Sequence, residues 1–429
     1  MLRSLARATP GVSPTSSPPL PLVTVVVAVA VVTLFCLVGC GADGGVLSDA
    51  EVLRPGARVT SRYRLYAEEL GRVDGAVVRA GGYSGLAFDS AGSLWAITDR
   101  GPNLEAATAR LHAAKRFPLP DYRPHARRID SAGGQLALGE RLGFLAADGG
   151  AATGLPPPSA APGLVVEEAL GPDFETLPHD PDGIDSEGVA FGAGSLWVSD
   201  EYRPSVWRLD PGSGRLLARY TPTPTGPLDR RLPAWLLQRR PNLGFEGLAF
   251  QRDPGYLYVA LQGPLSPPGA DARTRLVRIL RLDPATDRVR SFVYPLDGSR
   301  RKIGDLALSP EGYLLVLEHG ERFGRPWSAE VYAVDLARVD YLNDDGLPPE
   351  RFSDVPTALT AGVLVAGKEL YVDLLAAGWP AAWSKPEGLA CDAAGRLYLV
   401  NDDDFGIDSP AGTGAAVMTG ADSYLVVIE

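Results

Sequence analysis

One short phrase recurs along this chain and constrains its fold more than any other feature. Each copy is a serine or glutamate, a glycine and a short apolar run, followed by a turn and a second apolar run. A fifth copy is degenerate and has an aspartate after its glycine. Repetition at such intervals is typical of propellers and solenoids. The copies are Ser84-Gly85-Leu86-Ala87-Phe88, Glu187-Gly188-Val189-Ala190-Phe191, Glu246-Gly247-Leu248-Ala249-Phe250, Gly304-Asp305-Leu306-Ala307-Leu308 and Glu387-Gly388-Leu389-Ala390-Cys391.

The segment from Glu187 to Tyr220 shows what one repeat contains. Its four apolar stretches, 187–191, 195–199, 205–209 and 214–220, are separated by turn residues. Four short antiparallel strands make one blade of a β-propeller. The long interval between the first two copies has room for one further blade, near residues 135–148. The sequence therefore predicts an all-β, six-bladed β-propeller with long loop insertions, and the interval before Glu387 leaves seven blades as the alternative.

The two chain ends are expected to close the ring. The last unit, residues 387–429, contains only three apolar runs, and residues 58–66 could supply its fourth strand. Such pairing would leave no strand edge exposed.

The N-terminus predicts export. Two arginines precede a nearly continuous apolar run over 22–38, which ends in Leu37-Val38-Gly39-Cys40. This order is typical of a secretory signal peptide, and the last four residues resemble a bacterial lipobox. We expect a signal peptide over 1–39, a lipidated Cys40 beginning a linker over 40–57, and one propeller domain over 58–429. The lipid would hold the protein outside the cytoplasm, in the periplasm or at the cell surface, although an uncleaved membrane anchor is an alternative.

Charge and motifs exclude several functions. The chain has 41 Lys and Arg against 52 Asp and Glu, a net charge of -11. Nucleic acids need a basic surface, so we expect no nucleic-acid partner. The histidines lack zinc-ligand spacing, and there is no nucleophile-elbow serine or phosphate-binding loop. We expect a monomer that binds a cation, although the same charge also suits simple solubility.

The acids of the repeat are expected to meet at one mouth of the propeller. In an antiparallel hairpin the start of one strand lies beside the end of the next, so Glu187 neighbours Asp200 and Glu201, and Glu387 neighbours Asp402. First strands line the central channel, so acids from different blades converge there. Calcium prefers such oxygen ligands. Alternatively, the acids clasp neighbouring backbone or pair with nearby arginines and lysines.

These considerations select three sets of candidate residues. The candidate catalytic residues are Glu187, Glu246, Glu318 and Glu387; the candidate metal ligands are Asp99, Asp200, Glu201, Asp402 and Asp403; and the candidates for gripping an anionic substrate are Arg100, Arg203 and Lys385.

The same residues resemble the phytase-like family, also described as esterase-like activity of phytase, in a bacterial lipoprotein form. The resemblance runs from about Gly81 to the C-terminus, and it implies a propeller that hydrolyses ester or phosphoester bonds. The chain departs from the family at Gln262, where an acid is frequent, and at Asp403, where asparagine is frequent. The resemblance rests on Ser84-Gly85-Leu86, Thr98-Asp99-Arg100-Gly101-Pro102, Asp185-Ser186-Glu187-Gly188, Ser199-Asp200-Glu201, Gly244-Phe245-Glu246-Gly247-Leu248-Ala249, Leu317-Glu318, Lys385-Pro386-Glu387-Gly388 and Asn401-Asp402-Asp403-Asp404-Phe405.

Together these observations predict an extracytoplasmic hydrolase of a small phosphoester or carboxylic ester, with Ca²⁺ as its cofactor. A divalent cation at the acidic mouth would polarise the ester and lower the pKa of an attacking water. Two other functions stay open. One is a non-enzymatic propeller that binds a glycan, peptide or envelope protein at the cell surface, and the other is a lactonase of the gluconolactonase type.

Overall fold

The computed structural model describes residues 52–65, 68–106, 114–132, 135–159, 166–322, 325–343, 346–383 and 385–429. The expected signal peptide and Cys40 lie outside these residues. In the described part of the chain the fold is all-β, with one short α-helix, α1 (Val355–Thr360), and a few 3-10 turns. No described helix is long and apolar enough to span a bilayer.

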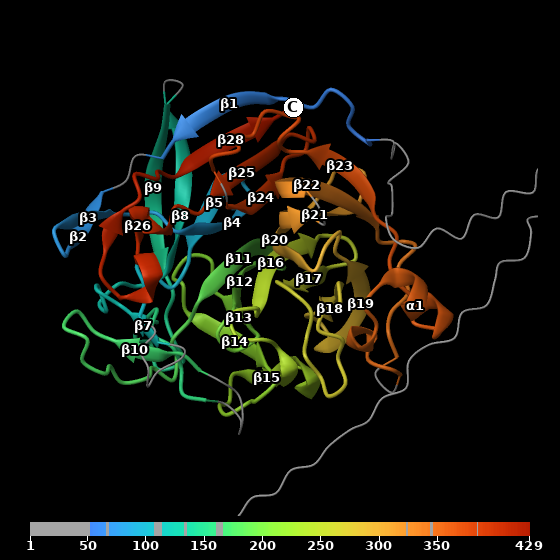
Figure 1. Ribbon diagram of the computed structural model, residues 1–429, viewed down its shortest axis with the longest axis horizontal. Helices are drawn as coiled ribbons and strands as arrows, with labels where there is room; N and C mark the ends of the chain where they lie inside the picture. The colour runs from blue at the N-terminus through green and yellow to red at the C-terminus, as the bar shows by residue number, and fades with distance from the viewer. Residues whose placement is uncertain are drawn as a thin grey trace, which may run out of the picture. The chain divides into compact units, whose positions relative to one another are not determined.

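Five sheets of four or five strands make up most of the described chain (Figure 1). The first sheet contains β4 (Tyr83–Phe88), β5 (Leu94–Thr98), β8 (His125–Ala132) and β9 (Gln135–Gly143), and the second contains β11 (Ser186–Gly192), β12 (Ser195–Asp200), β13 (Ser205–Leu209), β14 (Leu216–Thr221) and β15 (Asp229–Arg231). The third contains β16 (Phe245–Gln251), β17 (Tyr256–Leu261), β18 (Leu276–Asp283) and β19 (Arg288–Pro295), and the fourth contains β20 (Arg300–Leu308), β21 (Tyr313–Arg322), β22 (Arg325–Asp335) and β23 (Glu369–Asp373). The fifth contains β24 (Pro386–Cys391), β25 (Leu397–Asn401), β28 (Tyr424–Ile428) and β1 (Val59–Arg64).

The first strand of each sheet lies at the centre of the arrangement. β4 contacts β11, β11 contacts β16, β16 contacts β20, β20 contacts β24, and β24 contacts β4 again. Apolar side chains fill the space between successive sheets, as where Trp197 of the second sheet stacks on Phe250 of the third. The sheets therefore follow one another around a common centre, which is a β-propeller-like architecture.

The count of six blades is wrong for the described chain. The extra blade was expected near residues 135–148, but β9 pairs antiparallel with β8 and is the fourth strand of the first sheet. The interval is long because an insertion separates β5 from β8 and another precedes β11. These insertions carry the small sheet of β6 (Leu104–Glu105), β7 (Ala114–Arg116) and β10 (Glu168–Leu170).

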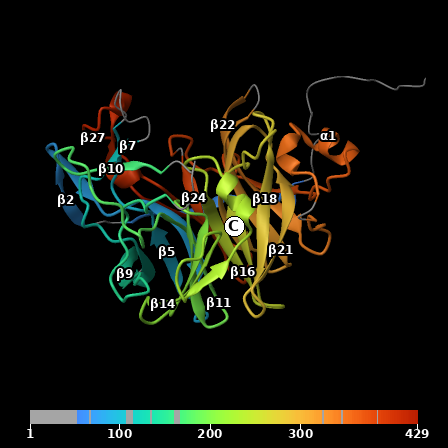
Figure 2. The ribbon, with the colours of Figure 1, turned by 90° about the horizontal axis from the view of Figure 1, so that it is seen from below.

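The insertions gather at one end of the sheets. Figure 2 shows β7, β10, β27 (Val417–Met418) and α1 toward the same side of the sheets. Two short pairs complete the described strands: β2 (Glu69–Val73) with β3 (Ala76–Arg79), and β26 (Ile407–Asp408) with β27. The insertion with β6 and β7 follows the end of β5, so it lies at the end where second strands finish and first strands begin.

The expected pairing of the two chain ends is present. β1 lies antiparallel beside β28, with Arg62 opposite Val426 and Arg64 opposite Tyr424. The N-terminal segment thus supplies the outer strand of the fifth sheet, as predicted for residues 58–66.

Glycine lets the inner strands approach one another closely. A Cβ atom on Gly188 would lie 2.3 Å from the carbonyl oxygen of Glu246, and one on Gly247 would lie 2.4 Å from the backbone nitrogen of Leu306. Real side chains do not tolerate such distances, so the glycine of the repeated phrase is required by packing.

In the fourth sheet Asp305 occupies the position of that glycine. Its fully buried carboxylate accepts hydrogen bonds from the backbone N–H groups of Leu306 at 2.7 Å, Leu389 at 2.8 Å and Leu86 at 3.3 Å. We call it the central carboxylate. It links β20 to β24 and β4 at the centre of the fold.

Candidate functional site

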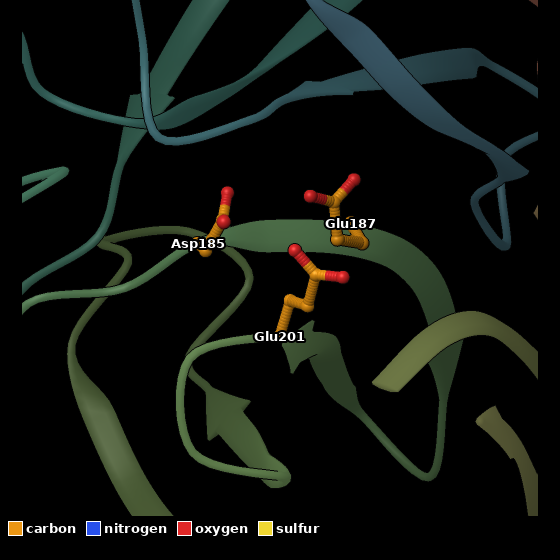
Figure 3. A group of neighbouring side chains, drawn as sticks. All are labelled: Asp185, Glu187 and Glu201. Carbon is orange, nitrogen blue, oxygen red and sulfur yellow. The ribbon is translucent and has the colours of Figure 1, made fainter. Parts of the chain in front are cut away.

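Three acidic side chains meet where β11 begins and β12 ends. Asp185 directly precedes β11, Glu187 is the second residue of β11, and Glu201 directly follows β12. The backbone N–H of Glu201 donates to the carbonyl of Asp185 at 2.9 Å, which holds the two ends together. One carboxylate oxygen from each residue lies within 4.8 Å of the others (Figure 3). We call these residues the acidic trio.

The acidic trio is buried and incompletely hydrogen-bonded. The exposed fractions of Asp185, Glu187 and Glu201 are 0%, 8% and 3%. Glu201 Oε1 and Asp185 Oδ2 are buried without a hydrogen-bond donor in the described chain, although Arg100 Nε lies 3.2 Å from Asp185 Oδ2. Burial, with the neighbouring acids, raises the pKa of Glu187 well above its usual value and that of Glu201 to about 7. Oxygen-only ligands in this state fit a hard divalent cation such as Ca²⁺.

Two more glutamates of the repeat face the same place. Glu246 and Glu387 are the second residues of β16 and β24. Burial, Glu201 and Glu387 raise the pKa of Glu246, while burial and Asp402 raise that of Glu387 to about 8. The structure thus brings Glu187, Glu246 and Glu387, far apart in the sequence, into one interacting group.

Asp99, Asp402 and Lys385 adjoin this group. Burial, followed by the charges of Asp402 and Asp185, raises the pKa of Asp99. Lys385 Nζ lies 3.0 Å from Asp402 Oδ2 and 2.6 Å from Asp404 Oδ1. Lys385 therefore adjoins the site, and two carboxylates of the chain are already paired with it.

Asp200, a predicted metal ligand, holds backbone instead. Its Oδ1 accepts from the N–H groups of Asp185 at 3.2 Å and Tyr202 at 3.1 Å, and its Oδ2 accepts from Ser205 Oγ at 2.7 Å. Both oxygens are occupied by turn contacts, so Asp200 has the clasp role that was the alternative.

Asp403 has the same kind of role. Its Oδ1 accepts from the backbone N–H of Gly82 at 2.9 Å and from that of Phe405 at 3.2 Å. The first contact joins the fifth sheet to the start of β4, so Asp403 fixes the backbone between two sheets.

Glu318, a predicted catalytic residue, lies in a separate ion network. Its Oε2 is 2.9 Å from Arg301 Nε, and its Oε1 accepts from the Tyr294 hydroxyl at 2.6 Å and from Lys368. Arg301 also pairs with Glu330. Glu318 is fully buried with both oxygens occupied, so we correct its assignment to a structural one.

Arg100 is not free to grip a substrate, contrary to the prediction. Its guanidinium lies 2.7 Å from Glu167 Oε2 and 3.2 Å from Asp185 Oδ2, and it donates to Asn242 Oδ1 at 3.0 Å. Arg100 therefore positions the carboxylate of Asp185 through this ion pair.

The hydrogen bond that Arg203 forms lies outside the acidic trio. It donates to the carbonyl of Pro181, and burial lowers its pKa while the neighbouring charge of Asp200 opposes that shift. Of the two arginines, Arg100 is held by ion pairs, whereas Arg203 Nε is buried without a hydrogen-bond partner in the described chain.

The candidate sets selected from the sequence leave out three residues of the site. Asp185, Lys302 and Lys385 all stand two residues before the first residue of the repeated phrase, and only Lys385 was selected. Residues two apart on a strand project to the same face, so this spacing was the available signal. His319, opposite Lys302 on β21, was the third omission.

Comparisons with known proteins agree with the resemblance. A family model described as Phytase-like, esterase-like activity of phytase, matches residues 78–405. An uncharacterized secreted protein of Arthroderma benhamiae is 32% identical over 124 residues, which cover 23% of this chain and 24% of that protein. The chain therefore matches about a quarter of that relative's length.

Several solved structures are distantly similar. A putative oxidoreductase (glucose dehydrogenase) of Thermus thermophilus has a TM-score of 0.32 at 15% identity, over 85% of this chain and 99% of that one. The glutaminyl cyclase of Myxococcus xanthus has a TM-score of 0.35 at 11% identity, over 87% of this chain and 96% of that one. The PQQ-bound aldose sugar dehydrogenase of Streptomyces coelicolor has a TM-score of 0.33 at 12% identity, over 85% of this chain and 98% of that one. At these values the activities of the three proteins say nothing about this chain.

Proposed function

Since the chain belongs to the phytase-like family, described as esterase-like activity of phytase, we propose that it is a cation-dependent hydrolase of phosphoester or carboxylic ester bonds. The observation that carries this proposal is the acidic trio, three buried carboxylates with oxygens within 4.8 Å of one another. The unpartnered Oε1 of Glu201 supports it, because a buried acceptor without a partner is costly unless a ligand completes it.

The acidic trio would hold the cation, and Ca²⁺ suits its all-oxygen character. A cation held there would supply Lewis-acid chemistry, polarising an ester oxygen and lowering the pKa of a water molecule. Arg100 fixes Asp185, and the Gln262 amide donates to Glu246, so both acids are held in place by their own partners.

Glu387 is the best candidate for moving a proton. Its pKa of about 8 places its proton exchange near neutral pH, and no described side chain hydrogen-bonds its carboxylate. Groups that titrate near the working pH are the most effective general acids and bases. We assign it the transfer of a proton between water and the leaving oxygen.

The test is hydrolysis of p-nitrophenyl phosphate and p-nitrophenyl acetate with Ca²⁺, Mg²⁺ or EDTA. We expect turnover of one substrate class with a cation and none in EDTA. Glu187→Gln and Glu387→Gln should each lower kcat by about 100-fold without loss of folding. Glu140→Gln, at a side chain 53% exposed, is the matched control and should keep full activity. Absence of turnover on both substrates under every cation condition would refute the proposal.

We also propose that the protein acts outside the cytoplasm, held to a membrane by lipid on Cys40. The lipobox-like residues 37–40 and the similarity to a secreted protein support this location. Labelling of the full chain with a palmitate analogue should mark the wild type and not Cys40→Ala. Equal labelling of both would contradict the anchor.

A further inference from the structure

Two lysines face the acidic trio from the other side of the centre. Lys302 and Lys385 stand at the same repeat position as Asp185, two residues before the phrase. Asp185 precedes β11, whereas Lys302 lies on β20 and Lys385 just before β24. The neighbours of β11 among the inner strands are β4 and β16, so β20 and β24 lie across from it. The site is therefore negative on one side and carries positive charge on the other.

The positive charge of Lys302 acts on the acids of the site. Burial raises the pKa values of Glu201, Glu246 and Glu387, three acids from three different sheets, and the charge of Lys302 offsets part of each rise. Within the described residues, Lys302 forms no ion pair or hydrogen bond through its ammonium group. It differs in this from Lys385, which is paired with Asp402 and Asp404.

His319 lies beside Lys302 with an unused ring nitrogen. The two residues are directly opposite in the β20–β21 register, where Cβ atoms are about 5 Å apart and project to the same face. His319 is 7% exposed, and its Nε2 is buried without a partner in the described chain. Burial and the nearby cations Lys302, Arg301 and Lys385 lower its pKa to about 3, so its imidazole is neutral.

We propose that Lys302 and His319, flanked by Lys385, form an anion subsite that binds an oxyanion group of the substrate, either phosphate or carboxylate. The ammonium group of Lys302 supplies the charge, and His319 supplies an N–H donor from Nε2. Charge-assisted hydrogen bonds of this kind are short and strong. The subsite rests on the proposed function, because it names the charged part of the substrate that the hydrolase would act on.

The arrangement explains both unused groups together. A buried ring nitrogen that faces cations has no donor role to fill within the protein, and an anionic oxygen would complete it. The same oxyanion would lie between Lys302 and the cation of the acidic trio, so opposite charges would alternate across the site. If Lys302 instead served only to balance Glu246 and Glu387, its removal would leave anion binding unchanged.

The experiment is titration calorimetry of inorganic phosphate and of acetate, each with Ca²⁺ and with EDTA, at concentrations below those at which calcium phosphate precipitates. We expect the wild type to bind at least one anion in at least one condition. Lys302→Gln and His319→Phe should weaken that binding about tenfold or more. His319→Gln, which can place an N–H near the position of Nε2, should retain most of it.

Two controls separate the subsite from general effects. Arg300→Gln removes the same charge two residues away on β20, from a side chain 78% exposed, and should bind the anion as the wild type does. Lys302→Gln should bind Ca²⁺ as tightly as the wild type or more tightly, because a positive charge beside the acids is lost. Damaged folding would weaken both ligands, and thermal melting of each variant checks this directly.

Wild-type anion affinity in Lys302→Gln, or no binding of either anion by the wild type in either condition, would overturn the subsite. Its failure is distinct from that of the proposed function. Lys302-dependent phosphate binding without any turnover would refute the hydrolase and keep the subsite. Turnover by the wild type together with unchanged anion binding in Lys302→Gln would keep the hydrolase and refute the subsite. Tighter binding of phosphate than of acetate would identify the oxyanion group of the substrate as a phosphate. Tighter binding of acetate would identify it as a carboxylate.

Discussion

Removal of the central carboxylate should weaken the whole fold. In Asp305→Ala the three N–H donors of Leu86, Leu306 and Leu389 lose their common acceptor. Each unpartnered buried donor costs about 1–3 kcal/mol. Burial raises the pKa of Asp305, which means that the carboxylate is itself costly to bury, so the lower end of that range applies. We expect the free energy of unfolding to fall by about 3 kcal/mol.

Asp305→Asn should lie between alanine and the wild type. Leu86 and Leu389 donate to Oδ2 and Leu306 donates to Oδ1, so an amide oxygen in the Oδ2 position keeps two of the three bonds. The expected loss is about 1 kcal/mol. Urea unfolding followed by tryptophan fluorescence measures both variants, and Asp121→Ala, with a side chain 103% exposed, is the control. If Asp305→Ala unfolds at the same urea midpoint as Asp121→Ala, the central carboxylate does not hold the inner strands together.

Three further predictions test the acids and the packing of the inner strands. Glu201→Gln removes one ligand of the acidic trio and should lower Ca²⁺ affinity about tenfold or more by calorimetry; unchanged affinity would place the cation elsewhere. The pKa of Glu201 is raised to about 7 and that of Glu387 to about 8 from a usual 4.5, so their stabilising contribution is complete below pH 4.5 and is lost as the pH rises through 7 to 8. In EDTA the melting temperature should therefore fall between pH 4.5 and about 8, and Ca²⁺ should suppress this fall. A melting temperature in EDTA that does not change with pH would contradict the pKa assignments. Gly188→Ala should abolish soluble, folded protein because its Cβ would lie 2.3 Å from the Glu246 carbonyl, while Gly143→Ala, with nothing within 4 Å, should fold normally by circular dichroism.

The inner strands could be predicted from the sequence because each repeats one phrase. Copies at Glu187, Glu246 and Glu387 fall in β11, β16 and β24, and the degenerate copy falls in β20. The number of sheets could not be predicted from spacing, because insertions lengthen an interval as effectively as a blade does. Residues 135–143 looked like a new repeat and instead extend the first sheet, since strand partners depend on where the chain returns after an insertion.

The convergence of acids was predictable, while the partner of each acid was not. Rotation of one strand around a centre brings the same position of every copy to the same end, which applies to Glu187, Glu246 and Glu387. Glu318 lies at the end of an apolar run as the repeat predicted. Its carboxylate, however, is bound by Lys368, which lies 50 residues further along the chain. The path of the intervening insertion sets that contact, and no local pattern in the sequence records it.

The order of strands in the fifth sheet has a consequence for how the protein is made. β28 lies between β25 and β1, so the last described strand pairs with the first described strand (Figure 1). Until Tyr424–Ile428 has been synthesised, β1 lacks its partner and β25 has an open edge. Folding of this sheet must therefore wait until residues 424–428 have been synthesised, and a chain that lacks them would have an unpaired edge on both β1 and β25.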